Sequence, residues 1–157
     1  MDWGVFSWPE LVNSVFPVYA GLGVSAYTLF MGRIELRKRG TISYLQNQVS
    51  DPNIIKMSDE FSDVRDKSNT LTATLNNTNM NTNGSRVVRR YLNQREVLCT
   101  AVLSKAMDEK IVKSAMGLNM QQDYQMTKHY INEVRRITSS PEFCEDFEKL
   151  MIRWEEE

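Results

Sequence analysis

Charged residues are distributed very unevenly along this chain of 157 residues. From Leu11 to Gly32 the sequence runs for 22 residues without Asp, Glu, Lys, Arg or His. A helix of this length, at about 1.5 Å per residue, spans the roughly 30 Å hydrocarbon core of a bilayer. The pattern therefore predicts a single membrane-spanning helix near the N-terminus.

The flanks of this stretch predict its orientation. Its C-terminal side carries a basic cluster made of Arg33, Arg37, Lys38 and Arg39. Its N-terminal side has Asp2 and Glu10 but no Lys or Arg, which is the reverse of a cleaved signal peptide. Because basic residues concentrate on the cytoplasmic side of a span, we expect the N-terminus outside and residues 33–157 in the cytoplasm. A buried helix of a soluble protein is the alternative, but covering it would take a larger domain than the remaining chain supplies.

The predicted span has a polar and small-residue face. Its members are Asn13, Ser14, Gly21, Ser25 and Thr28. Polar groups within a membrane face a partner or a water-filled path, and Gly21 with Ser25 has a spacing that lets two helices approach closely. We therefore expect self-association into a homo-oligomer, although one such pair also arises by chance. Membrane lipid is the other expected partner, since anionic headgroups attract the basic cluster.

After the basic cluster the apolar spacing is helical throughout, and no alternating strand pattern occurs. The sequence thus predicts an all-α protein, with residues 1–50 forming the membrane anchor and its basic extension and residues 51–157 a small cytoplasmic helical bundle. Ser7 and Glu10 form a capping box for the first helix, which Asp51-Pro52 ends.

The second helical segment has a heptad-like seam, suited to packing either within the chain or across an oligomer. The seam consists of Ile54, Met57, Phe61, Val64, Leu71 and Leu75. Apart from Met80, residues 76–84 are Asn, Thr and Gly, and we expect this stretch to form a mobile loop. Ser85 then suits the N-cap of a third helix that extends to Leu103.

Three further helices complete the predicted bundle. Asp108 and Glu109 suit the first turn of a fourth helix, which Gly117 ends before a fifth helix begins. Ser140-Pro141 then supplies an N-cap and a first helical position for the last helix. That helix is predicted to bury Phe147, Leu150, Met151 and Trp154.

Composition argues against several kinds of chemistry. The net charge is −1, and lipid accounts for the basic cluster, so nucleic acid is not an expected partner. Cys99 and Cys144 are too few for a disulfide framework or a zinc site and fall on apolar stripes, as packing residues do. Asp59, Glu60 and Asp63 fit no calcium loop. With no phosphate-binding glycine loop or nucleophile motif, we expect no metal, no cofactor and no enzymatic activity.

Four positions remain as candidate chemistry: Arg95, Glu96, His129, and Arg135 or its neighbour Arg136. One interpretation is that they converge between helices as a pocket for a ligand or phosphate. The other is that Glu96 and Arg135 form a partly buried ion pair that fixes the register of the bundle, with His129 on a polar face. We favour the ion pair, because one histidine without partners specifies no reaction.

The chain resembles an uncharacterised bacterial family, a domain of unknown function, of short proteins with an N-terminal membrane helix. The resemblance is carried by Gly40–Leu45, Leu92–Glu96, Asp108-Glu109, Gly117, Tyr130-Ile131 with Arg135, and Phe147–Trp154. It implies an architecture at the bacterial inner membrane and brings no known reaction.

More distantly, the plan of one anchor and a helical bundle resembles membrane accessory proteins of RNA-targeting CRISPR systems, whose bundle is related to HEPN domains. HEPN ribonucleases carry an arginine followed about four to six residues later by a histidine, so that a cation and an imidazole meet at the phosphate. The one histidine here is His129, and Asp123-Tyr124-Gln125 occupies the positions where that arginine would stand. We therefore expect no HEPN nuclease activity.

Two function classes follow. In the first, the chain is a membrane-anchored, self-associating, non-enzymatic effector whose oligomer opens a pore, and the resemblance suggests antiphage defence as its setting. In the second, it is a membrane-tethered adaptor that recruits a cytoplasmic protein partner.

Overall fold

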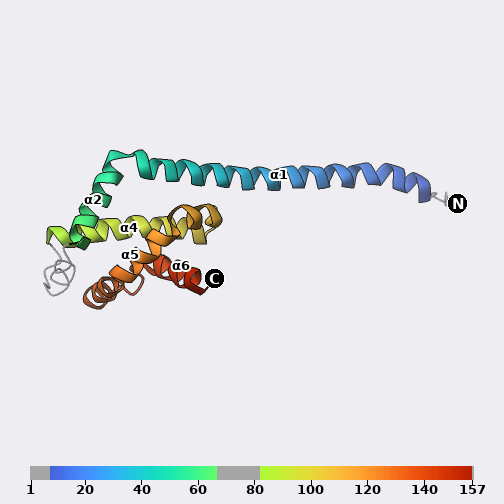
Figure 1. The fold of residues 1–157 in the computed structure, drawn as a ribbon. Coiled ribbons are helices and arrows are strands. Elements are labelled where there is room, and N and C mark those ends of the chain that lie inside the picture. Colours follow the sequence, from blue (N-terminus) through green and yellow to red (C-terminus); the bar gives the residue numbers. More distant parts are fainter. Residues whose placement is uncertain (1–7, 67–81, 157) are drawn as a thin grey trace. The chain divides into compact units, whose positions relative to one another are not determined.

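The computed structural model describes residues 8–66 and 82–156, and the side chains of residues 24–65 and 82–156. The described residues form helices and no strand, so the predicted all-α class is confirmed (Figure 1). The helices are α1 (Trp8–Ser50), α2 (Pro52–Asp66), α4 (Asn83–Leu103), α5 (Glu109–Thr138) and α6 (Glu145–Glu156).

The chain divides into two compact units, Met1–Arg37 and Lys38–Glu157. Helix α1 contributes to both units, and it ends at Ser50 before Asp51-Pro52 as the sequence predicts. The predicted start at Ser7 lies outside the described residues. Across the part of the chain that the structure describes, we find no helix with a stretch long and apolar enough to cross a membrane.

The second unit is a helical bundle built around α4, which packs against α2, α5 and α6 (Figure 1). Helix α4 buries residues at spacings of three and four, which gives it one broad face toward the core. The last helix buries its predicted set, since Phe147, Leu150, Met151 and Trp154 are all at most 3% exposed. These side chains form the centre of one continuous hydrophobic core.

The C-terminal turns of α1 belong to this bundle. The fully buried hydroxyl of Thr41 accepts a hydrogen bond from the backbone N–H of Asp108, with 2.8 Å between N and Oγ1. Farther along, Gln94 Nε2 donates to Gln48 Oε1 over 2.9 Å. From Thr41 to Gln48 the chain advances along α1, whereas the partners of these two residues go back from Asp108, just beyond α4, to Gln94 within it. This part of α1 therefore runs antiparallel to α4.

The described part of the predicted seam packs within the chain. Met57 and Phe61 of α2 are buried, and the Phe61 ring stacks on Tyr91 of α4 with 3.8 Å between centroids. Leu71, Leu75 and most of the predicted loop, residues 76–81, lie outside the described residues. The end of that predicted loop is structured, because Asn83 and Gly84 form the start of α4.

The structure corrects the predicted N-cap of α4. The cap is Thr82, whose hydroxyl accepts from the backbone N–H of Ser85 over 3.2 Å. Ser85 itself lies in the first helical turn, with its hydroxyl buried and hydrogen-bonded to the Tyr130 hydroxyl over 2.8 Å. Thr82 and Ser85 are both good capping residues, and the contact with α5 decides which of them enters the helix.

The prediction that Gly117 ends a helix is wrong, because α5 is continuous from Glu109 to Thr138. Gly117 is buried within α5 beside Trp154, and a Cβ atom there would lie 3.8 Å from the Trp154 ring and 3.3 Å from Lys113 Cγ. The nearer of these two atoms belongs to the side chain of Lys113 on α5 itself, and the buried residues Val112 and Met120 on either side of Gly117 hold this part of α5 against the core.

The predicted start of the last helix at Ser140-Pro141 is also wrong. Residues 141–144 form turns, and α6 begins at Glu145. Ser139 and Cys144 adopt left-handed backbone conformations, with φ of 54° and 59°, which direct the chain between α5 and α6. The next two N–H groups of α6, those of Asp146 and Phe147, are capped by the Glu96 side chain of α4.

Candidate functional site

Arg95 lies in a buried polar network between α4 and α5. Its Nη2 atom lies 3.2 Å from Asp123 Oδ2, and it also donates to the Tyr91 hydroxyl, which in turn donates to the same carboxylate. The guanidinium lies over the Tyr91 ring, 4.7 Å from its centroid. Burial raises the pKa of Tyr91 to about 12, so this hydroxyl stays protonated and acts as a hydrogen-bond donor.

Asp123, the partner of Arg95, is not among the residues predicted from the sequence. The available signal was its position, because Asp123 falls on the buried stripe of α5 beside Met120, Tyr124 and Thr127. A carboxylate on such a stripe requires a cation and hydrogen-bond donors to offset its desolvation.

Glu96 performs a capping role and does not pair with Arg135. Its carboxylate oxygens accept hydrogen bonds from the backbone N–H groups of Asp146 and Phe147, over 3.0 Å and 2.8 Å. Thr100, one turn later on α4, donates to the Asp146 carboxylate over 2.6 Å. A carboxylate at a helix N-terminus satisfies free N–H groups and interacts favourably with the helix dipole. Glu96 thus connects α4 to the start of α6.

Arg135 of α5 binds the segment that leads into α6. Its Nε donates to the backbone carbonyl of Phe143 over 2.9 Å, and its Nη1 donates to Glu148 Oε2 over 2.7 Å. The other Glu148 oxygen accepts from the Tyr124 hydroxyl over 2.9 Å. Burial pushes the pKa of Glu148 upward, but the hydrogen bonds from Arg135 and Tyr124 outweigh it and hold that pKa below its usual value. The expected ion pair of Arg135 therefore forms with Glu148.

His129 is exposed on α5, on the side of the helix that carries Glu133. The structure thus distributes the four predicted residues over separate contacts. Arg95 pairs with Asp123, Glu96 caps α6, Arg135 pairs with Glu148, and His129 faces outward.

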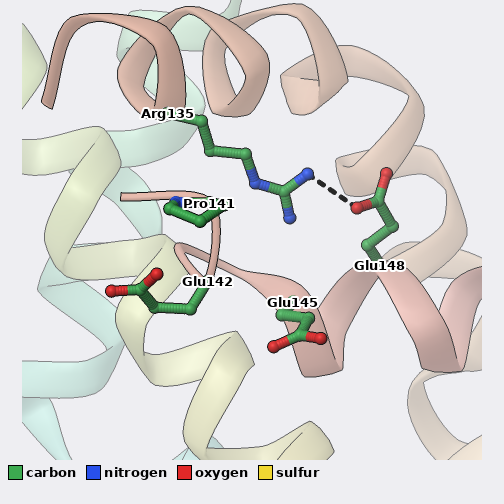
Figure 2. Close-up of a pocket in the computed structure, with 5 residues that line it drawn as sticks. All are labelled: Arg135, Pro141, Glu142, Glu145 and Glu148. Atoms are coloured by element: carbon green, nitrogen blue, oxygen red, sulfur yellow. Dashed lines mark hydrogen bonds and ion pairs between the residues drawn. The ribbon is translucent and has the colours of Figure 1, made fainter. Parts of the chain in front are cut away.

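A pocket of about 460 Å³ lies beside Arg135, and Figure 2 shows the side chains around it. It is lined by Arg135, Pro141, Glu142, Glu145 and Glu148. Glu148 is held by Arg135, and Glu145 pairs with Lys149 over 2.7 Å. Three carboxylates around one guanidinium repel a phosphate, and this lining contains no histidine, cysteine, serine or threonine. Among the residues that the structure describes, no group of three or more His, Cys, Asp or Glu side chains is placed to hold a metal ion.

Cys99 and Cys144 are free thiols within the core, both at most 2% exposed. Burial raises the pKa of Cys144 to about 12 and raises that of Cys99 as well. Since the thiolate is the reactive form, both thiols are inert packing groups at neutral pH.

Of the polar and small-residue face predicted for the membrane span, the structure describes the side chains of Ser25 and Thr28. The side chains of Asn13, Ser14 and Gly21 lie outside the described residues. Ser25 and Thr28 are exposed on α1, and the Thr28 hydroxyl donates to the Val24 carbonyl of its own helix. In the basic cluster Arg33, Lys38 and Arg39 are exposed, whereas Arg37 is half-buried.

These features define an all-helical protein whose bundle is joined by ion pairs and a side-chain cap between helices. Residues 15–154 match the family model for a domain of unknown function, DUF4760. The chain belongs to this family, which confirms the expected membership of an uncharacterised family. No curated protein and no solved structure matches the chain. The likeness in plan to CRISPR accessory proteins stays a prediction.

Proposed function

We propose that this protein is a membrane-anchored, non-enzymatic effector that self-associates through its N-terminal helix. The observation that carries the proposal is the uncharged stretch from Leu11 to Gly32, followed at once by the basic cluster. Its length suits a bilayer, and the charge asymmetry favours an external N-terminus and a cytoplasmic bundle at the bacterial inner membrane. The setting that we propose, from the resemblance in plan, is antiphage defence.

A pore is the proposed action of the oligomer. Asn13 and Ser14 are adjacent polar residues near the outer end of the span, where a polar group favours a partner helix or a water-filled path. Thr28 carries less weight, because its hydroxyl is already hydrogen-bonded to its own helix.

The proposal that the protein is not an enzyme is supported by the ion pairs and hydrogen bonds that its buried and half-buried charged side chains form between helices. Arg95, Glu96 and Arg135 are each engaged in joining one helix to another. Residues used in this way stabilise the arrangement of helices and are not held ready for a substrate.

The experiment combines the mass of the full-length protein in mild detergent with the permeability of cells that express it. We expect a discrete oligomer, and we expect Asn13→Leu and Ser14→Leu to reduce dye entry while the protein remains in the membrane. Val15→Leu is the matched control within the same stretch. A monomer, or unchanged permeability in both polar variants, would contradict the pore.

A membrane-tethered adaptor is the second candidate, and the exposed face of α5 favours it. Leu118 and Met126 are 69% and 52% exposed two turns apart on this helix, and Ile137 is 39% exposed. Exposed apolar side chains on one helix face suit a protein partner. The packing of α2 inside the bundle also removes one route to self-association. A monomer in detergent that binds a cytoplasmic protein through α5 would support the adaptor.

A further inference from the structure

The turn between α4 and α5 lies at the same end of the bundle as the entry of α1. The buried Thr41 hydroxyl accepts from the Asp108 backbone N–H over 2.8 Å, which fixes this juxtaposition. Lys38 lies one turn before Thr41, while Lys105 and Lys110 lie three residues before and two after Asp108. All three lysines are exposed. The fold thus places Lys38, Lys105 and Lys110 at one end of the bundle, and we call this surface the basic end.

The turn that carries Lys105 is held by backbone hydrogen bonds. The N–H of Lys105 donates to the carbonyl of Val102, and the N–H of Met107 donates to the carbonyl of Ala101, each over 3.0 Å. Lys105 is therefore presented from a defined turn that Thr41 and Asp108 join to α1.

The carboxylates beside the basic end are engaged elsewhere. Asp108 caps α5, with its Oδ1 accepting from the Ile111 N–H over 3.3 Å. Glu109 accepts from both Arg153 and the Trp154 indole N–H. In the described part of the chain, none of the three lysines has an ion-pair partner, so their charges face solvent.

We propose that the basic end binds the anionic headgroups of the inner leaflet, so that the bundle contacts the membrane surface in addition to being tethered to it. This inference rests on the proposed membrane anchor. Only six residues lead from Gly32 to Lys38, a path of about 9 Å as helix and at most about 22 Å when extended. Headgroups extend about 5 to 8 Å beyond the hydrocarbon core, and surface charge acts over roughly another 8 Å.

Chain length therefore favours lipid over other anions as the occupant. Lys38 is kept near the headgroups by the anchor, and the contact between Thr41 and Asp108 keeps Lys105 and Lys110 near Lys38. Each lysine near an anionic surface strengthens the contact by about fivefold.

The test uses the full-length protein in vesicles of phosphatidylcholine alone or enriched in phosphatidylglycerol. A membrane-impermeant amine reagent labels exposed lysines, and mass spectrometry compares Lys105 and Lys110 with Lys56. Lys56 is an exposed residue of α2, so it serves as an internal control for orientation and amount. We expect the labelling of Lys105 and Lys110 relative to Lys56 to slow by at least about fivefold in anionic vesicles, and to recover in high salt.

Flotation of the same vesicles separates the two proposals. Protein that floats with equal relative labelling in both lipids would overturn the lipid-binding surface and leave the anchor standing. Protein that does not float would overturn both. Protection that appears in phosphatidylcholine vesicles only after RNA is added would identify nucleic acid as the ligand and also overturn the inference.

Discussion

Arg95 of α4 and Asp123 of α5 form a buried ion pair, with 3.2 Å between Nη2 and Oδ2 and side-chain exposures of 9% and 7%. The Tyr91 hydroxyl donates to the same carboxylate, so two donors from α4 converge on one acceptor of α5. Such an arrangement fixes the register of the two helices, because sliding either one would leave a charge buried without its partner.

Removing one partner of this pair is expected to destabilise the bundle strongly. Asp123→Ala leaves the Arg95 charge buried and should lower the free energy of unfolding by about 3–5 kcal/mol. The double variant Arg95→Met with Asp123→Leu should recover much of that loss, since it removes both charges. Urea unfolding followed by circular dichroism measures both effects. Asp59→Ala, on the exposed side of α2, is the control, and a double variant no more stable than Asp123→Ala would contradict this reasoning.

The cap that Glu96 supplies to α6 gives a second prediction. Glu96→Ala should cost about 1–3 kcal/mol, because the N–H groups of Asp146 and Phe147 lose a charged acceptor. Glu96→Gln keeps one acceptor oxygen and should cost less. Hydrogen exchange should accelerate at these two amides in particular. Val97→Ala, at a neighbouring exposed position, should leave their exchange unchanged, and unaltered exchange in Glu96→Ala would rule out the cap.

The two buried thiols should be unreactive in the native protein. Burial raises the pKa of both Cys99 and Cys144 and excludes reagents from them. Ellman's reagent at about pH 8 should therefore modify neither thiol until denaturant is added, and both afterwards. Rapid reaction of either thiol without denaturant would show that the junction of α4 and α6 opens readily.

The pair of Arg135 and Glu148 should make stability depend on pH in the acid range. Its hydrogen bonds hold the folded-state pKa of Glu148 below the unfolded value, so its contribution is present above about pH 4.5 and is lost as the pH falls through the folded pKa. Glu148→Gln should therefore cost about 1 kcal/mol near neutral pH and progressively less in acid. Chemical unfolding across this range measures the difference, and a difference that stays constant down to about pH 3 would contradict the assignment.

Helical periodicity was enough to predict the all-α class and the buried face of α6, because both depend on local apolar spacing. It failed at Gly117, where a residue typical of helix ends lies within a continuous helix. The reason is tertiary, since Gly117 lies on the buried face of α5 beside Trp154, and packing against the core continues the helix through it. A single sequence contains no local signal that separates these two uses of glycine.

The candidate site was predicted less well, because its partners are distant in the sequence. The ion pair predicted between Glu96 and Arg135 does not form, because Arg135 pairs with Glu148 and Glu96 caps α6. The start of α6 was misplaced for a related reason, since its cap comes from α4 and no local residue supplies it. Spacing along one helix indicates which residues share a face, but it does not identify the opposite helix.

The central claim is that Leu11–Gly32 anchors the chain in a membrane. The most direct measurement is alkaline carbonate extraction of membranes from cells that express the full-length protein. We predict that the protein stays in the membrane pellet and is released only by detergent, as expected for a span of about 20 residues. Release into the carbonate supernatant would contradict the anchor, and with it the pore and the tethered adaptor.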